Sequence, residues 1–304
     1  MTVDLSVDLC GITLAHPVIN GSGTFDALAA RRAFGAQLDA GFPFSAFVSK
    51  TITPEPRPGN PPPRLYETPA GMINSIGLPN KGLEGFLVAD LPELARLPVP
   101  LIVSVMAPSR VGFETLVERV GARAEVAAIE LNVSCPNVKS GLIVGEQPAE
   151  TLALCEALRP LTDKPLIVKL TPNTADPAAV ARAAAEAGAD AVSLINTLRA
   201  TAIAPATGEP WLGATSGGLS GPAVRPVALD QVRRVAAEVS IPVIGMGGIE
   251  SGADALDFLA AGAGAVAVGT ASFRDPLAGE RVRSELETEL LARGASGLSS
   301  RIVM

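Results

Sequence analysis

The chain has 304 residues, of which 48% are hydrophobic, with 24 Lys and Arg against 31 Asp and Glu. That content supports a sizeable core in one large domain or two smaller ones. The net charge of −7 gives no basic field for a nucleic-acid backbone, and a single His argues against a His-rich metal site or a His-based triad. Three Cys without a CxxC pair cannot ligate an iron–sulfur cluster and suit a reducing compartment.

No apolar run approaches the roughly 18 residues that a membrane helix needs, and the richest stretch, 98–108, is short and bounded by Pro. The N-terminus carries Asp4 and Asp8 and no basic segment, so we expect no signal peptide. These features predict a cytoplasmic protein.

Short and solidly apolar runs recur along the chain, each followed by a polar or Gly-rich turn and then a helical segment. Such runs are typical of parallel strands that are buried on both faces. The eight runs are 17–20, 44–50, 100–105, 127–134, 165–170, 190–196, 241–248 and 264–270. Eight alternating strand–helix units predict a (β/α)8 barrel, formed as a single domain by residues 1–304.

Capping residues mark two of the intervening helices. Asp176 is expected to begin one that Gly188 ends, and Ser251 to begin another that runs to about Ala261. Residues 1–14 read as a short β-hairpin that closes the opposite end of the barrel from the active site.

Three segments are longer than a barrel connection requires: 51–69, with seven Pro, 134–147, and 197–222. Each follows a predicted strand, so all three are expected as loops on the C-terminal face, where barrel active sites lie.

Polar or small residues end every predicted strand. They are Asn20, Lys50, Ser104, Asn132, Lys169, Asn196, the pair Gly247 and Gly248, and the pair Gly269 and Thr270. Solvated strand ends are the alternative explanation, but a purely structural chain has no reason to repeat this pattern eight times. Only five Lys occur against 19 Arg, and two of the five end strands. A Lys there either extends its ammonium to solvent or approaches a ring or carboxylate closely.

Glycines stand at the ends of the last two predicted strands, in GMGGI (245–249) and VGT (268–270). Backbone N–H groups at such turns can approach an anion, and barrels often hold a phosphate there. A GxGxxG fingerprint fails because Glu250 takes the place of its last Gly, and no GxxxxGK[ST] occurs. The pattern favours a phosphate-bearing ligand over ordinary tight turns.

Cys135 stands in NVSCPN, just beyond a predicted strand end. A thiol there is a candidate nucleophile or proton acceptor. His16 precedes the first strand and cannot pair with it, which favours proton transfer over hydrolysis. We interpret Cys10, Cys155 and His16 as structural.

Asparagines gather on the same predicted face, at Asn74, Asn80, Asn132, Asn137 and Asn196. Amides both donate and accept hydrogen bonds, so this cluster suits a flat ring with C=O and N–H edges. Lys50 nearby indicates that the ring also carries a carboxylate.

The chain resembles the class 1 dihydroorotate dehydrogenases from about residue 3 to about residue 290. The motifs that carry the resemblance are KTITPEPRPGNPPPR (50–64), ETPAGMINSIGLPN (67–80), ELNVSCPNVKSG (130–141), LIVKLTPN (166–173), LINT (194–197), GGLSGPA (217–223), IGMGGI (244–249) and AVAVGTASF (265–273). The second and seventh motifs are more similar to subclass 1B than to subclass 1A.

The resemblance implies FMN across the barrel mouth and dihydroorotate stacked on it. Flavin contacts would come from Ser22, Lys50, Thr51, Ser104, Asn132, Lys169, Ile195 and Gly221, with the phosphate at Gly247, Gly248, Gly269 and Thr270. Substrate contacts would come from Lys50, Asn74, Ser75, Ile76, Gly77, Leu78, Asn132, Asn137, Asn196 and Thr197. Lys169 would stabilise negative charge on reduced flavin. Cys135 would take the C5 proton while hydride leaves C6, giving orotate for pyrimidine biosynthesis.

Subclass 1B implies a partner subunit with FAD and a [2Fe–2S] cluster that passes electrons to NAD⁺. It also implies an assembly with two copies of each subunit.

Ser104 departs from the family, because many relatives have Asn there, and we expect flavin binding to survive with a shifted potential or affinity. The alternatives are a subclass 1A enzyme that uses fumarate and another FMN barrel that acts on dihydropyrimidines. A non-redox phosphate-binding barrel and a non-catalytic scaffold fit the strand-end residues less well.

Overall fold

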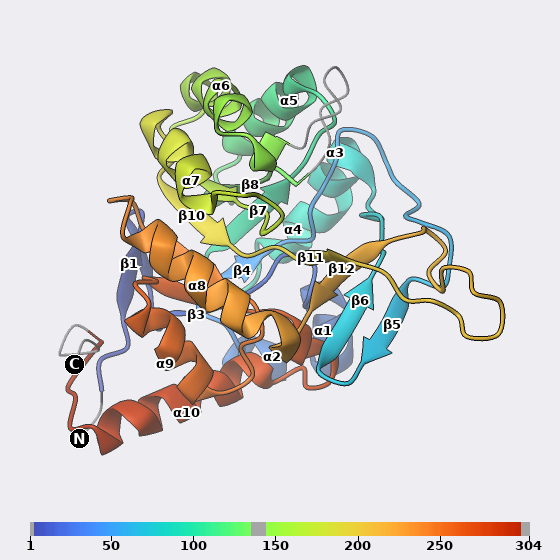
Figure 1. Ribbon diagram of the computed structural model, residues 1–304. Helices are drawn as coiled ribbons and strands as arrows, with labels where there is room; N and C mark the ends of the chain where they lie inside the picture. Colours follow the sequence, from blue (N-terminus) through green and yellow to red (C-terminus); the bar gives the residue numbers. More distant parts are fainter. Residues whose placement is uncertain (1–2, 135–143, 299–304) are drawn as a thin grey trace.

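The computed structural model describes residues 3–134 and 144–298, and a parallel eight-stranded sheet forms its centre (Figure 1). The strands, in spatial order, are β3 (Val18–Asn20), β14 (Ala265–Val268), β13 (Val243–Met246), β10 (Ala191–Leu194), β9 (Leu166–Lys169), β8 (Ala128–Asn132), β7 (Leu101–Val105) and β4 (Phe47–Val48). Each lies inside one of the eight predicted runs, so the predicted (β/α)8 barrel is confirmed.

The barrel is closed between β3 and β4 by a side chain. The backbone there contributes a bond from Ser45 N–H to Val18 O, at 3.0 Å. Asn20, which is fully buried, supplies the rest: its Nδ2 donates to Val48 O, and Val48 N–H donates to its Oδ1, both at 2.8 Å. The Asn20 amide therefore takes the place of backbone–backbone hydrogen bonds between β3 and β4.

The helices lie around the outside of the strands (Figure 1). They are α1 (Ala27–Phe34), α2 (Ala36–Ala40), α3 (Gly82–Gly85), α4 (Leu91–Leu94), α5 (Arg110–Gly121), α6 (Pro148–Leu158), α7 (Pro177–Glu186), α8 (Arg225–Ala236), α9 (Gly252–Ala260) and α10 (Ala278–Ala292). The Asp176 side chain caps α7, and Ser251 caps α9 in a capping box with Asp254, as predicted. In the described part of the chain, no helix has the length and apolar character needed to cross a membrane.

Helical turns complete the connections: η1 (Phe86–Asp90), η2 (Val144–Glu146), η3 (Arg159–Leu161), η4 (Pro222–Val224) and η5 (Thr270–Phe273). The predicted N-terminal hairpin is present as β1 (Val7–Leu9) and β2 (Ile12–Leu14). Leu9 and Leu14 pack into the apolar cluster that fills the barrel interior, so the hairpin closes its amino-terminal end.

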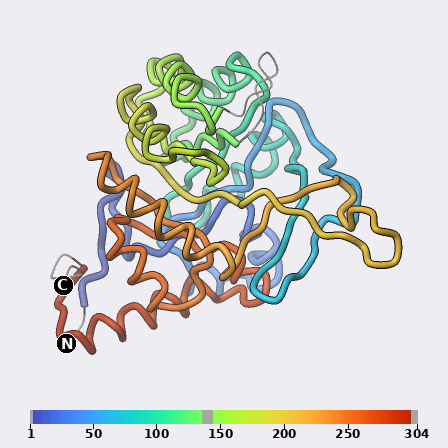
Figure 2. Tube along the Cα trace, viewed as in Figure 1, coloured from blue at the N-terminus to red at the C-terminus, as the bar shows by residue number. Residues whose placement is uncertain are grey.

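Two of the three long segments contain strands that the sequence did not predict. β5 (Leu65–Thr68) and β6 (Gly71–Asn74) pair with β11 (Leu198–Ala200) and β12 (Gly217–Ser220) in an antiparallel sheet of order β11–β12–β6–β5. This sheet lies to one side of the barrel mouth, bringing together segments far apart in sequence (Figures 1 and 2). Segments 51–69 and 197–222 thus lie at the predicted face as insertions between barrel strands and helices, but the strands within them were not predicted. Most of 134–147 lies outside the described residues.

Candidate active site

A cavity of about 1260 Å³ lies at the carboxyl ends of the barrel strands. Its size exceeds the roughly 300–1,000 Å³ of typical small-molecule sites, so it has room for a large ligand or for two. The predicted residues that line it are Ser22, Lys50, Thr51, Asn74, Ile76, Gly77, Leu78, Asn132, Lys169, Ile195, Asn196, Thr197, Gly221, Gly247, Gly248, Gly269 and Thr270. Cys135 and Asn137 lie outside the described residues.

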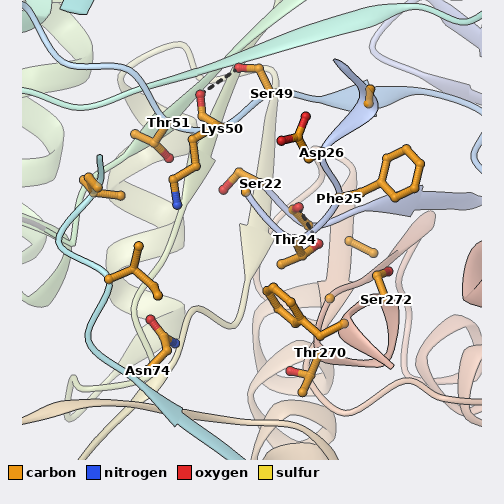
Figure 3. Close-up of a pocket in the computed structure, with 18 of the residues that line it drawn as sticks. Ser22, Thr24, Phe25, Asp26, Ser49, Lys50, Thr51, Asn74, Thr270 and Ser272 are labelled. Carbon is orange, nitrogen blue, oxygen red and sulfur yellow. Dashed lines mark hydrogen bonds between the residues drawn. The ribbon is translucent and has the colours of Figure 1, made fainter. Parts of the chain in front are cut away.

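Two lysines, buried Lys169 and half-buried Lys50, line this cavity. Lys169, on β9, donates to Ser22 Oγ at 3.0 Å. Lys50 follows β4, and its side chain points into the cavity that Ser22 also lines (Figure 3). Burial and then the positive charge of Lys169 lower the pKa of Lys50. Neither ammonium has an ion-pair partner among the described residues, so the cavity around them favours an anionic or electron-rich ligand.

Gly23 makes room for the Lys50 side chain. Its φ is +73°, and a Cβ there would lie 2.7 Å from Lys50 Cδ. A larger residue would therefore face both backbone strain and a collision with the lysine.

Glycines form the other end of the cavity. Gly247 and Gly248 have φ of +128° and +78°, and a Cβ on Gly248 would lie 2.8 Å from Gly221 O. These close approaches bring backbone from three connections to one place, beside Thr270. Ser272 also lines this end, and its buried Oγ has no hydrogen-bond partner among the described residues. This end therefore has the polar, side-chain-free surface that a phosphate requires.

The asparagines differ in how much of their amide remains free for a ligand. Asn80 uses both Nδ2 and Oδ1 within its own loop, bonding Thr53, Leu78 and Gly82, so it is structural. Asn74 donates to Gly218 O at 3.2 Å, which ties β6 to β12. Among the described residues, the Asn132 amide takes part in one long bond, which it accepts from Ser134 N–H at 3.4 Å, and it lines the cavity.

Two predicted contact residues do not line the cavity. Ser75 is buried, and its Oγ accepts from Asn60 Nδ2 at 3.0 Å, so it supports the loop that places Ile76. Ser104 is fully buried within the barrel, where its Oγ bonds Thr51 Oγ1 and Glu130 Oε1, each at 2.9 Å.

Sequence reasoning missed Glu130 and Ser193. Glu130 lies two residues before Asn132 on β8, so the period of two places both side chains on the inward face. Its Oε2 accepts from Ser193 Oγ at 3.3 Å. A Glu within an apolar strand run was the available signal. A second cavity of about 210 Å³, lined partly by Arg199 and Ser134, shares Asn196 and Thr197 with the first.

The arrangement fits an elongated ligand with a phosphate at the glycine end and an electron-rich ring beside the lysines. FMN has this form. Ser272 and the glycines suit its phosphate, while Lys50, Thr51 and Lys169 suit its ring. The fold and cavity thus define a (β/α)8 barrel with a cavity at the carboxyl ends of its strands that has the size and lining to suit a phosphorylated cofactor and a small substrate.

The comparisons with known proteins agree with that description. The family model for dihydroorotate dehydrogenase matches residues 4–290, and the chain belongs to this family. Relatives named dihydroorotate dehydrogenase B (NAD(+)), catalytic subunit, include proteins of Pelobacter propionicus (46% identical, 99% of this chain and 98% of the relative), Desulforudis audaxviator (46%, 99% and 97%) and Geobacter metallireducens (45%, 98% and 97%).

Proposed function

We propose that this chain oxidises dihydroorotate to orotate in pyrimidine biosynthesis, with FMN bound in the large cavity. The observation that carries the proposal is the pair of lysines, buried Lys169 and half-buried Lys50, that face one cavity without an ion-pair partner among the described residues. Family membership and the names of the relatives support it. FMN would supply hydride acceptance, which no side chain can provide.

The chain's own residues would bind and orient the reactants. Lys50 offers a compact positive charge to the dihydroorotate carboxylate, and Asn132 and Asn196 offer amide groups to the ring edges. Lys169, held by Ser22, would stabilise negative charge that develops on the reduced ring. The substrate proton at C5 would pass to Cys135, which remains a sequence-based assignment.

We further propose that electrons leave through a partner subunit with FAD and a [2Fe–2S] cluster, which reduces NAD⁺ in an assembly of two copies of each subunit. The relatives' names support this, since each is called a catalytic subunit and cites NAD(+). The chain has three Cys and no GxGxxG, so it needs another protein for that chemistry. Phe34 and Phe273 line the cavity and are each 53% exposed, so we propose that the partner docks over these two side chains.

One anaerobic titration tests the proposal. The purified chain is loaded with FMN, reduced with dihydroorotate, and offered NAD⁺ or fumarate while the flavin absorbance is recorded. We expect dihydroorotate to bleach the flavin and neither acceptor to restore its absorbance in the chain alone. Once the electron-transfer partner is added, NAD⁺ should restore it. Recovery with fumarate alone would identify a subclass 1A enzyme. A chain that binds no FMN, or whose FMN dihydroorotate does not bleach, would refute the proposal.

A further inference from the structure

A chain of buried hydroxyls connects the cavity to a carboxylate inside the barrel. Thr51 lines the cavity, and its Oγ1 lies 2.9 Å from Ser104 Oγ. Ser104 Oγ in turn lies 2.9 Å from Glu130 Oε1, and Ser193 Oγ lies 3.3 Å from Oε2. All four side chains are at most 3% exposed. The proposed mechanism uses neither Ser104 nor Glu130.

The chemistry of these groups fixes which one donates in each hydrogen bond between Thr51 and Glu130. Both Ser104 Oγ and Ser193 Oγ donate to the Glu130 carboxyl group, and a hydroxyl has a single proton to donate. Ser104 therefore donates to Glu130 and must accept from Thr51. The Thr51 hydroxyl proton is therefore donated to Ser104 Oγ inside the barrel. Only the lone pairs of Thr51 Oγ1 are then left to face the cavity.

We propose that Glu130 is a positioning residue that acts through Ser104 to fix the Thr51 hydroxyl, and that this arrangement lowers the reduction potential of the bound flavin. The inference rests on the proposed FMN site. A buried negative charge and an oxygen lone pair both oppose the charge that the flavin gains on reduction. Glu130 therefore counteracts Lys50 and Lys169, which favour the reduced form.

The position of Ser104 supports this assignment. Its hydroxyl is short enough to stay between Thr51 and Glu130, and its backbone N–H is fixed by Ser49 Oγ at 3.1 Å. Ser49 also donates to Lys50 O at 3.1 Å, so the serine pair supports both neighbouring residues of the predicted flavin site. Ser104 thus acts through Thr51, without contact with the cavity.

The test measures the flavin midpoint potential of the FMN-loaded full chain and its variants by redox titration against a reference dye. Glu130→Gln keeps the shape and removes the charge, and we expect about a tenfold shift toward reduced flavin, equivalent to about +30 mV for two electrons. Ser104→Ala breaks the connection and should shift the potential in the same direction. Ser193→Ala is the matched control, because it removes the other hydroxyl on Glu130 and leaves the path to Thr51 intact.

A double-mutant cycle with Thr51→Val separates positioning from general damage to the fold. Ser104→Ala should change the potential in the wild-type background and add nothing to Thr51→Val. Should Glu130→Gln fail to fold, Ser104→Ala and this cycle still decide the matter. Unchanged potentials in Glu130→Gln and Ser104→Ala, with flavin still reduced by dihydroorotate, would overturn the inference and leave the proposed function intact. Equal shifts in Ser193→Ala and Ser104→Ala would also overturn it.

Discussion

Side chains in this barrel take their roles from their height along the strands. Polar residues at the carboxyl ends face the cavity, as Lys50 and Lys169 do, whereas His16 lies at the other end. Cys10 and Cys155 are also remote from the cavity, and burial raises the pKa of each thiol to about 12. Both thiols stay protonated near neutral pH, which suits structural residues.

The proton-acceptor assignment is tested by Cys135→Ser. A serine hydroxyl is a much weaker base than a thiolate, so we expect flavin reduction by dihydroorotate to slow by roughly 10²–10⁴-fold while FMN stays bound. Stopped-flow absorbance under anaerobic conditions measures this rate. Cys10→Ser is the matched control, and its rate should equal that of the wild type. A Cys135→Ser rate within a few-fold of wild type would remove Cys135 from the mechanism.

His16 should make stability depend on pH. Burial, and then the charge of Arg283, lower its pKa from 6.5 to about 4, and its Nδ1 accepts a bond from Val18 N–H at 3.3 Å. As pH falls, His16 in the unfolded chain takes up a proton before buried His16 in the folded chain does. The stability that neutral His16 contributes to the folded state is therefore complete above pH 6.5 and is lost between pH 6.5 and 4.

Between pH 7.5 and 5 this loss is about 2 kcal/mol in the free energy of unfolding. Urea denaturation at both pH values measures it. His16→Asn keeps an acceptor near Val18 and cannot titrate, so its stability should fall by about 2 kcal/mol less than that of the wild type. Equal losses in the two proteins would show that His16 does not cause the pH dependence.

At the level of secondary structure, the junction between β3 and β4 depends on one amide. Asn20→Ala would leave the buried N–H and C=O of Val48 without partners, and each such group costs about 1–3 kcal/mol. We therefore expect a loss of about 2–5 kcal/mol in the free energy of unfolding, measured by urea denaturation.

Ser45→Ala provides the comparison at the same junction. It removes a hydroxyl bond to Val18 O, an acceptor that still receives Ser45 N–H, so it should cost about 1 kcal/mol or less. If Asn20→Ala were as mild as Ser45→Ala, the barrel would not need the amide to close.

The same junction shows what the sequence could and could not predict. Continuous apolar runs located all eight barrel strands, because buried parallel strands require them. The pattern marked Asn20 as a strand-end polar residue, but its pairing with Val48 depends on where two distant strands meet. The β6–β12 pairing was missed for the same reason, since short Gly-containing strands gain their partners only from the folded arrangement. Spacing placed Ser104 at a strand end but could not show that its hydroxyl bonds Thr51 and Glu130 instead of lining the cavity.

On the scale of the whole molecule, the cavity is bounded by two separate structures. The barrel contributes Lys169 and Asn132, and the antiparallel sheet contributes Met72, Asn74 and Ser220. A ligand long enough to span the cavity would contact both, so we expect its binding to fasten the sheet to the barrel mouth.

Hydrogen exchange with and without FMN tests this coupling. Amides of β6 and β12 exchange when the sheet opens locally, and a ligand at 100 times its Kd disfavours the open state by about 2.7 kcal/mol, or roughly 100-fold in rate. The β1–β2 hairpin at the opposite end of the barrel is the internal control, and local opening there should be unaffected by FMN. Mass spectrometry of peptides that cover 71–74, 217–220 and 7–14 gives all three rates from one sample. Uniform slowing of all three would mean that FMN raises global stability without fastening the sheet, and no slowing in β6 and β12 would mean that the sheet does not contact the ligand.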